Sequence, residues 1–595
     1  MKKTIIGIDL GTTNCTMAYC FLEGEDTPEI VQFKIPQIIN QSFQDEHCSL
    51  PSFIYFPLQE EIESGMAKLD WSLAKQYAVG FFAKERGKEL SFRVIASAKS
   101  WLSVSGIDRK NSFLPLHAED KAHAFSPLEA ISCLLKHLRE AWDYKMGETP
   151  FEKADILITV PASFDPSARE LVKEAAELAG YPKIILLEEP QAAFYAWLYK
   201  EKEEWRKSLK VGDSILVADI GGGTTDFSLI SAENEEGDLV LKRVAVGEHL
   251  LLGGDNIDLS LAYLAKTKLE DAGNLLDDAQ FQSLIYACRE AKEKLLSENP
   301  PKSADVAIMG RGSRLIGGSL KTKITLEEAL QLVVEGFMPL VKKEEKSLEK
   351  ENSGLLEIGL NYAEDARISS QLAKFLWVKK ESVEEFVLPT AILFNGGTLK
   401  ASALRDRLVC QIDEWAKELG QKPVQVLNPA DLDYAVGLGA VYYGLSRSGK
   451  TVRIKSGTSK SYYVGVEDTA PAVPGIAKSM KAFCVAPCGM EEGSESEILN
   501  QEFQLAIGQK ATFRFFSPVN EKLNAKAPAV GSIIKKIKPS LMELPSIEAH
   551  LKRDEGEGKF VRVKLQSKVT ELGFLELWCL SHDGRKWKLE FNVRN

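Results

Sequence analysis

Two segments of the chain combine an aspartate with glycines and paired threonines, directly after an apolar run. One reads VADIGGGTTDFSLI at residues 217–230, and the other reads IIGIDLGTTNCTMA at residues 5–18. Each pattern predicts a strand, a tight glycine-rich turn and a returning strand. Glycines let the backbone approach a ligand closely, so that successive N–H groups can hold phosphate oxygens. The aspartate at each strand end can hold the waters of a Mg²⁺ ion, which makes both segments candidate phosphate and metal sites.

One glycine-rich hairpin is weak evidence, because short glycine motifs often bind no ligand. The repetition is more informative, since two such hairpins indicate duplicated halves that face each other across a cleft. We therefore expect a nucleoside triphosphate and Mg²⁺ between two lobes. The expected metal-binding residues are Asp9 and Asp219. The expected phosphate-binding residues of the two turns are Gly11, Thr12, Thr13, Asn14, Gly221, Gly222 and Gly223.

The two hairpins resemble the phosphate motifs of the actin, sugar-kinase and heat-shock chaperone superfamily. The forms IGIDLGTTN and DIGGGTTD are similar in particular to the seventy-kilodalton heat-shock (DnaK-like) chaperones, and the resemblance covers most of residues 4–445. It implies an α/β fold with a duplicated, actin-like ATPase domain. It also implies ATP or ADP and Mg²⁺ as cofactors, with K⁺ as a further candidate.

The resemblance implies a catalytic set drawn from several separate segments. A lysine in IASAKSWLS and a glutamate in LLEEPQAAF match the family's catalytic lysine and glutamate. Together with the second hairpin, the expected catalytic residues are Lys99, Glu189, Asp219 and Thr224. Without the resemblance, Lys99 would be interpreted as an exposed helix lysine and residues 155–197 as an ordinary βαβ unit. Pro161 and Arg169 fall on the family's interdomain signalling pair.

Three later segments match nucleotide contacts of the family. They are HLLLGGDNID at 249–258, CREAKEKLLS at 288–297 and a strand–Gly-Gly–helix segment within 388–408. They supply the remaining expected cofactor-binding residues: Gly253, Gly254, Lys292, Gly396, Gly397 and Thr398. The second segment departs from the family at Arg289 and Glu293, where Glu and Arg are usual, which leaves open how the base is held.

The sequence between these motifs predicts the elements that position them. DILITVPA indicates a buried strand ending at Pro161, followed by a helix that Asp165 caps and Gly180 ends. The apolar stripe of this helix is expected to be buried: Ala168, Leu171, Val172, Ala175, Leu178 and Ala179. Residues 70–104 are expected to be helical, and residues 23–50 to form an irregular surface segment.

From residue 462 onward, strand-like alternation replaces the helical period. SYYVGVE, GFLELWCL and KWKLEFNV are typical of an all-β domain at 462–595, best described as a sandwich. A basic linker at 446–461 joins it to the nucleotide-binding domain at 1–445. Its place corresponds to the family's peptide-binding β-sandwich, so we expect a substrate- or partner-binding domain.

Two family features are missing from this C-terminal part. The linker has no run of leucines, and the sequence closes on a strand at residues 586–593 without helices after it. We therefore expect a divergent member without a helical lid. Such a domain would bind polypeptide weakly, with an affinity that differs little between ATP and ADP states.

Two other sequence patterns are rejected as sites. GLSRSGKT at residues 444–451 satisfies the Walker A expression, but it follows an Ala/Gly-rich helix and precedes strand or linker sequence. A phosphate-binding loop needs a strand before it and a helix after it. Cys484 and Cys488 have no second cysteine pair or histidine cluster nearby, so a zinc site is not expected.

Composition excludes several classes of function. The chain has 595 residues, of which 44% are hydrophobic and 27% charged, as in ordinary globular proteins of several domains. The net charge of −11, without a block of Lys and Arg, argues against nucleic acid or an anionic membrane as the main partner. No secretory signal is visible, and no apolar run is long enough to cross a membrane. The nine scattered cysteines are typical of a protein whose thiols stay reduced. We expect a cytoplasmic protein.

The leading interpretation is an ATP-driven molecular chaperone that engages unfolded polypeptide or a specific client protein. The alternatives are a nucleotide-gated scaffold or exchange factor with little hydrolysis, a sugar kinase of the same superfamily, and an actin-like filament. The intact catalytic set disfavours the scaffold, and the C-terminal β domain disfavours the kinase and the filament. In relatives, J-domain co-chaperones dock through an Arg, an Asn and a Thr beside the catalytic glutamate. Ile185, Glu188 and Gln191 stand there instead, so generic J-domains are not expected to act on this chain.

Overall fold

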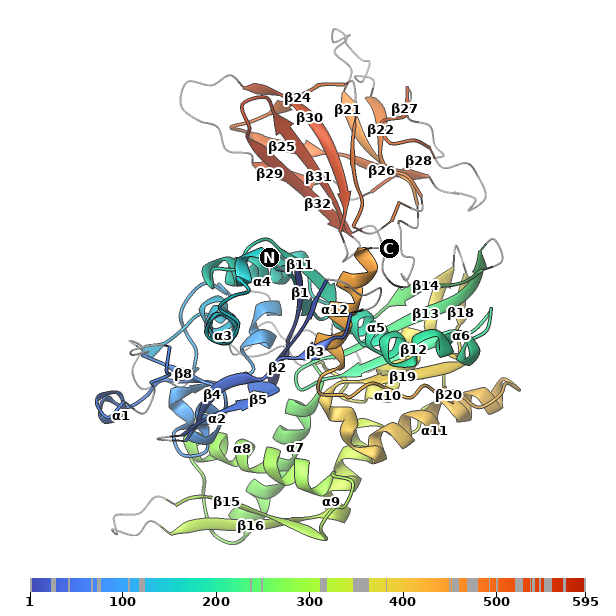
Figure 1. Cartoon of the computed structure of the whole chain (residues 1–595). Coiled ribbons are helices and arrows are strands. Elements are labelled where there is room, and N and C mark those ends of the chain that lie inside the picture. Colours follow the sequence, from blue (N-terminus) through green and yellow to red (C-terminus); the bar gives the residue numbers. More distant parts are fainter. Residues whose placement is uncertain are drawn as a thin grey trace. The chain divides into compact units, whose positions relative to one another are not determined.

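The chain divides into two compact units, Met1–Arg453 and Ile454–Asn595, in the computed structural model (Figure 1). The structure describes residues 3–592 apart from the following residues: 23–27, 41–42, 66–67, 72–75, 105–106, 117–122, 236–237, 248–249, 311–317, 346–362, 381–382, 449–450, 452–457, 459, 468–479, 489, 492, 499–500, 519–527, 536, 538–540, 545–546, 551–558 and 571–573. Most of the expected linker at 446–461 therefore lies outside the described residues.

The first unit contains two sheets with the same topology. Each has an antiparallel hairpin and two further strands that extend the sheet parallel to the first strand of the hairpin. In the first sheet these strands are β1 (Thr4–Leu10), β2 (Asn14–Phe21), β10 (Asp155–Val160) and β11 (Ile184–Glu188). In the second sheet they are β12 (Ser214–Ile220), β13 (Thr225–Glu235), β19 (Ala391–Asn395) and β20 (Gln425–Val426). The unit is therefore an α/β fold made of two lobes with duplicated strand order.

The outer strands also correspond between the lobes. The strand beside the hairpin is β3 (Val31–Gln32) in the first sheet and β14 (Asp238–Val246) in the second. In the first sheet, β6 (Ser49–Pro51) also pairs with β2.

Helices connect the parallel strands at matching positions in the two lobes. In the first lobe, α4 (Pro166–Leu178) connects β10 to β11, and α5 (Glu189–Glu201) follows β11. In the second lobe, α11 (Ser402–Glu418) connects β19 to β20, and α12 (Ala435–Arg447) follows β20. Helix α5 follows the last parallel strand of the first sheet and α12 that of the second, and the two helices pack against each other. This contact joins the two lobes.

Glycines let α12 approach its neighbours closely. A Cβ on Gly439 would overlap the carbonyl oxygen of Ala192 in α5, and one on Gly444 would lie 2.7 Å from the side chain of Ile5 in β1. Gly444 belongs to the last turn of α12. The Walker A-like segment thus begins inside a helix, which agrees with its rejection as a phosphate site.

Helix α4 forms as its sequence predicts, with one exception. The Asp165 side chain accepts a hydrogen bond from Ala168 N at 2.6 Å, and Gly180 follows the helix with a φ of 78°. Most of the predicted stripe is buried, but Leu178 is 60% exposed, so its assignment to the buried stripe was wrong. Leu178 is the last residue of α4 and lies beyond the part of the helix that neighbouring elements cover.

Further elements extend the first lobe. They are β4 (Ile35–Asn40), β5 (Phe43–His47), β7 (Ile54–Tyr55), α1 (Gln59–Glu63), β8 (Ala78–Val79), α2 (Phe81–Gly87), β9 (Val94–Ile95), the 3₁₀ helix η2 (Ala98–Ser103) and α3 (Pro127–Lys145). The helical expectation for residues 70–104 was correct at α2, at the 3₁₀ turn η1 (Ser91–Arg93) and at η2. It was wrong at β8 and β9, which pair with β7. The irregular segment expected at 23–50 instead contains β3, β4, β5 and β6.

The second lobe carries its own additions. They are α7 (Gly254–Asp271), α8 (Asp278–Leu295), β15 (Ser303–Met309), β16 (Ser319–Thr325), α9 (Leu326–Leu330), α10 (Ile368–Leu376), β17 (Trp377–Lys380) and β18 (Val383–Phe386). A single apolar core connects β12 and β19 with α7, α8, α10 and α11, and it includes Leu216, Leu261, Leu284, Leu372 and Leu404. This core fixes the helices that line the site described below.

The second unit consists of antiparallel strands. One five-stranded sheet comprises β27 (Ile533–Ile534), β22 (Met480–Ala486), β21 (Tyr462–Glu467), β26 (Phe515–Pro518) and β28 (Leu541–Glu543). Another comprises β23 (Glu495–Glu497), β24 (Phe503–Ala506), β30 (Phe560–Val569), β31 (Phe574–Ser581) and β32 (Lys586–Asn592). A two-stranded sheet pairs β25 (Lys510–Phe513) with β29 (Ile547–His550). Val464 and Phe483 of one large sheet share a core with Leu565 and Leu577 of the other.

Two further properties follow from the described residues. No helix among them is both long and apolar enough to cross a lipid bilayer. None of the nine cysteines, all of which lie within the described residues, forms a disulfide bond.

Candidate functional site

A cavity of about 650 Å³ opens where the two hairpin turns meet α7, α8 and residues 395–401. Most of the site residues predicted from the sequence line it: Asp9, Gly11, Thr12, Thr13, Asn14, Lys99, Glu189, Asp219, Gly221, Gly222, Thr224, Gly254, Lys292, Gly396, Gly397 and Thr398. The predicted residues outside its lining are Gly223, Gly253, Pro161 and Arg169. The fold thus brings segments from both ends of the first unit to one place.

The two hairpin turns lie directly against each other. A Cβ on Gly222 would overlap Thr13 Oγ1, and one on Gly223 would lie 2.9 Å from the Thr12 side chain. A larger residue at either glycine would push the two turns apart, because closely packed atoms have no room to give way. Gly223 therefore shapes the cavity without lining it.

The second glycine turn is held in place by hydrogen bonds from two other segments of the same lobe. Gly254 N donates to the Gly221 carbonyl at 3.0 Å, and Thr398 Oγ1 donates to the same oxygen at 2.8 Å. A Cβ on Gly253 would lie 2.7 Å from that oxygen, so this glycine permits the approach. Gly254 is also the first residue of α7, whose N-terminus carries the positive end of the helix dipole and favours anions.

A buried ion pair lies beside the first turn. Lys99 Nζ, from η2, contacts Glu189 Oε1 at the first position of α5, and both side chains are buried. Asp9, at the end of β1, accepts a hydrogen bond from Thr159 Oγ1 at 3.2 Å. Although burial opposes the charge on Lys99, Glu189 and Asp9 raise its pKa, so this lysine is a fixed cation in the wall of the cavity.

Negative charge is concentrated around that lysine. Burial, together with Glu189, raises the pKa of Asp9 to about 7. Burial also raises the pKa of Asp219 well above its usual range, with Glu189 and Asp226 adding to the effect. Burial likewise raises the pKa of Asp226. These shifts arise from several acidic side chains buried close to one another, an arrangement that a bound cation would relieve.

The donor set suits Mg²⁺ held through other ligands. Asp9 and Asp219 line the cavity, and their carboxylate oxygens are the hard donors that Mg²⁺ prefers. Among the described residues, no group of three or more His, Cys, Asp or Glu side chains could hold a metal ion together. Mg²⁺ usually keeps several waters and takes phosphate oxygens as ligands, which matches so sparse a set.

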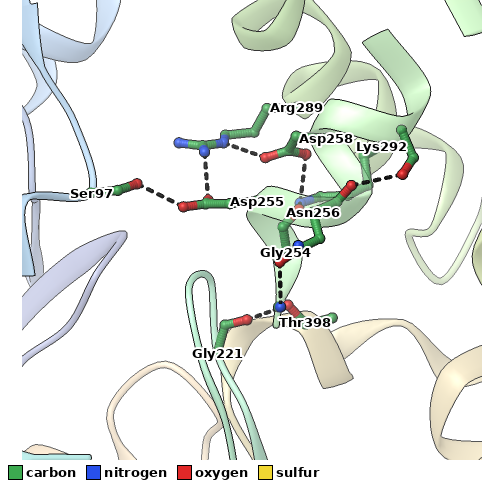
Figure 2. A network of polar contacts seen from close by, with 11 residues as sticks. Ser97, Gly221, Gly254, Asp255, Asn256, Asp258, Arg289, Lys292 and Thr398 are labelled. Carbon is green, nitrogen blue, oxygen red and sulfur yellow. Dashed lines mark hydrogen bonds and ion pairs between the residues drawn. The ribbon is translucent and has the colours of Figure 1, made fainter. Parts of the chain in front are cut away.

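A network of ion pairs and hydrogen bonds connects α7, α8 and Ser97 at the cavity (Figure 2). Arg289 of α8 reaches two carboxylates of α7, with Nε 2.7 Å from Asp258 Oδ2 and Nη2 2.7 Å from Asp255 Oδ1. Lys292 Nζ lies 2.7 Å from Asp258 Oδ1, and Ser97 Oγ donates to Asp255 Oδ2 at 2.7 Å. Figure 2 shows Arg289 pointing at the two aspartates, and Ser97 approaching Asp255 from the other lobe.

The network explains the unusual residues of α8. The guanidinium of Arg289 is committed to the two aspartates, so the residue replacing the family's usual Glu acts as a structural link. Glu293 lines the cavity together with Ser297 and Lys400. Lys400 Nζ lies 2.5 Å from Asp433 Oδ1, which fixes the opposite wall.

Pro161 and Arg169 lie together outside the cavity. Arg169 Nη2 donates to the carbonyl of Ala162, directly after Pro161, at 2.8 Å. The same nitrogen lies 3.6 Å from Glu188 Oε1. The two residues are therefore adjacent at the end of β10, and their role in signalling stays a prediction.

The sequence-based predictions omitted several polar residues of the site, among them Asp226, Asp255, Asp258 and Asn395. Asn395 ends β19 and precedes the Gly396–Gly397 pair, much as Asp219 precedes the glycines of its own turn. That parallel was a usable signal for Asn395. The two aspartates of α7 stand in HLLLGGDNID, but the sequence does not show that their partner is Arg289, which lies 34 and 31 residues after them.

Comparisons with known proteins agree with this geometry. A model of the family described as Hsp70 protein matches residues 5–352, which is more than half of the 595 residues. Over 362 residues, the chain is 28% identical to a chaperone protein HscA homolog of Bordetella petrii, a match that covers 60% of this chain. The chain spans only about half of the length of that curated relative, since 50% of it is matched. The resemblance inferred from the two hairpins is confirmed, and the chain belongs to the Hsp70 family.

Proposed function

We propose that the first unit binds ATP with Mg²⁺ in the cavity and hydrolyses it, and that the chain is an ATP-dependent molecular chaperone. The observation that carries the proposal is the buried Lys99–Glu189 pair in the cavity that both glycine turns line. It combines a fixed cation, a carboxylate and two sets of turn N–H groups in one cavity. Phosphoryl transfer needs positioning and charge stabilisation rather than covalent catalysis, and these groups supply both.

Each group has a distinct part in this mechanism. Lys99 stabilises the negative charge that spreads over the transferring phosphoryl group. Glu189, oriented by its contact with Lys99, accepts a hydrogen bond from the attacking water and aligns it. Thr224 contributes a hydroxyl at the second turn, and the glycine turns contribute backbone N–H groups. Asp9 and Asp219 would hold Mg²⁺, which screens the phosphate charges when bound.

The adenosine end would lie between α8 and the Gly396–Gly397 turn. Lys292, Glu293 and Ser297 form one side of the cavity there, and residues 396–401 form the other. Because the guanidinium of Arg289 is held by two aspartates, we assign the base contacts to its cavity-lining neighbours instead.

The second unit is proposed to bind polypeptide. Its two large sheets share one core, which supports the β-sandwich expected from the sequence. An extended segment could pair with a sheet edge and place alternate side chains in apolar pockets. The name of the HscA homolog, a chaperone, favours the same role. We further propose that the chain acts in the cytoplasm on unfolded polypeptide or a specific client.

Single-turnover hydrolysis of ATP by the full chain tests this function. The measurement follows phosphate release with and without a permanently unfolded protein, such as reduced and carboxymethylated α-lactalbumin. Release that the unfolded protein accelerates supports a chaperone. Tight ATP binding without phosphate release would instead indicate a nucleotide-gated scaffold, and transfer of phosphate to a small-molecule acceptor would indicate a kinase.

A further inference from the structure

Asn395 is a buried polar residue in the wall of the cavity. It is the last residue of β19, and in the parallel pairing of β12 with β19 it lies opposite Asp219. Its side chain is 2% exposed, yet it belongs to the cavity lining. The register of the central strands therefore places an amide beside a carboxylate that is expected to hold the metal.

The amide holds that carboxylate in one orientation. Asn395 Nδ2 donates to Asp219 Oδ2 at 2.9 Å, and within the described part of the chain it is the one side chain that donates to Asp219. The other oxygen, Oδ1, is bounded by Gly396, where a Cβ would lie 2.7 Å away. Gly396 has a φ of 89°, so glycine is suited to both the conformation and the contact. The carboxylate is thus confined on two sides.

The carbonyl oxygen of the same amide has no partner. Among the described residues, Asn395 Oδ1 is buried without a hydrogen bond. Leaving a buried polar atom unpaired is unfavourable, so such atoms usually have a water, ion or ligand as their partner. The amide cannot be reversed to solve this, because its oxygen would then oppose the Asp219 carboxylate.

Only one other residue of the cavity lining has such an atom within the described ranges. It is Asp258 Oδ1, and Lys292 Nζ lies 2.7 Å from it as an ion-pair partner. Within the described residues, Asn395 Oδ1 has no hydrogen-bond donor of this kind beside it. It therefore marks the place in the cavity wall where a hydrogen-bond donor of the bound ligand is required.

We propose that Asn395 is a positioning residue for the divalent cation. Its Nδ2 orients Asp219, and its Oδ1 accepts a hydrogen bond from a water ligand of the cation. The proposal rests on the proposed function, since it assumes a cation bound with the nucleotide. Groups that orient metal ligands typically change metal affinity by about 10–100-fold when they are removed.

The test compares Asn395→Val with the wild-type chain and with Gln411→Leu. Valine favours the strand conformation, is similar to asparagine in width and lacks both polar atoms of the amide. Gln411 is a buried amide of the same lobe, which donates to the Val341 carbonyl at 3.0 Å and does not line the cavity. The probe is Mn²⁺, whose free concentration is followed by electron paramagnetic resonance with and without ADP. ADP binding in EDTA is measured in parallel.

Asn395→Val is expected to weaken Mn²⁺ binding in the presence of ADP by about tenfold or more. Its affinity for ADP in EDTA should stay within about twofold of the wild-type value, because the cation is then absent. Gln411→Leu should lower the unfolding temperature and leave Mn²⁺ binding unchanged.

Three results would overturn the proposal. They are wild-type Mn²⁺ affinity in Asn395→Val, an equal loss of ADP binding in EDTA, and a matching loss of Mn²⁺ affinity in Gln411→Leu. A wild-type chain that binds no Mn²⁺ with ADP would contradict the proposed function itself, which separates the two failures.

Discussion

Ser97 Oγ donates a hydrogen bond to Asp255 Oδ2 at 2.7 Å, and this contact joins the two lobes across 158 residues of sequence. Ser97 has a φ of 53°, a conformation that is costly for a residue with a Cβ. It directly precedes η2, which carries Lys99. Since Arg289 holds the other oxygen of Asp255, the segment that carries Lys99 is held by a fixed carboxylate of the opposite lobe.

Removing this contact should speed nucleotide release. A hydrogen bond to a charged group contributes about 1.5 kcal/mol or more, so Ser97→Ala is expected to release ADP about tenfold faster. Ser97→Gly should release ADP equally fast, but it should unfold at a higher temperature than Ser97→Ala because glycine tolerates the positive φ. Stopped-flow fluorescence of labelled ADP and thermal melts measure the two effects. Wild-type release rates in both variants would show that the contact does not hold the cleft closed.

The chemical step should depend on Lys99 and Thr224. Lys99→Ala and Thr224→Ala are each expected to retain ATP but to slow single-turnover hydrolysis, since each removes charge stabilisation worth about 2–4 kcal/mol of barrier. Lys207→Ala serves as the control, because Lys207 is an exposed lysine paired with Glu204 on the surface. Hydrolysis at the wild-type rate in both site variants would refute the catalytic assignment.

The glycine hairpins could be predicted from the sequence because their signals are local. The aspartate, glycines and threonines of each turn stand within a few residues of one another, and the repeat of the pattern indicated two lobes. The place of Asn395 before Gly396 and Gly397 repeats this local pattern, but its partner could not be predicted in this way. Its hydrogen bond to Asp219 spans 176 residues and exists only because β19 pairs in parallel with β12.

The same distinction explains the errors in the secondary structure. Strands β8 and β9 have two residues each, too few to show alternation, and they form by pairing with β7. The sequences of β8 and β9 therefore gave no strand signal of their own. Leu178 has the spacing of a buried helix position, but the sequence does not show where the covering elements end.

The metal-free chain should lose stability as the pH rises. Burial, with Glu189, raises the pKa of Asp9 in the folded state from 3.8 to about 7. Between these values the folded state binds more protons than the unfolded state, so the free energy of unfolding falls with increasing pH. Thermal melts in EDTA between pH 5 and pH 8 should show this fall, and Asp9→Asn should reduce it. An unfolding temperature that rises with pH over this window, or an equal fall in Asp9→Asn, would contradict the assignment.

The crossing of α5 and α12 should tolerate no side chain at Gly439. A Cβ there would overlap the Ala192 carbonyl oxygen, and backbone atoms cannot move aside as a flexible side chain can. Gly439→Ala is therefore expected to lower the free energy of unfolding by about 1–3 kcal/mol or more, despite the higher helix propensity of alanine. Gly336→Ala is the control, because nothing lies within 4 Å of a Cβ at Gly336. Denaturant titration should show a loss for the first variant and no loss for the second.

Generic J-domain co-chaperones are expected not to stimulate this chain. Of the three positions that replace the docking residues of relatives, Glu188 and Gln191 are buried, and Glu188 Oε1 lies 3.6 Å from Arg169 Nη2. These two side chains cannot offer a partner the surface hydrogen bonds that relatives use. Single-turnover hydrolysis with and without an unrelated J-domain should therefore give rates within about twofold of each other, because without a docking surface the partner adds no differential binding energy. The same J-domain must stimulate its own Hsp70 under identical conditions, and a several-fold acceleration of this chain would show that J-domains dock elsewhere on it.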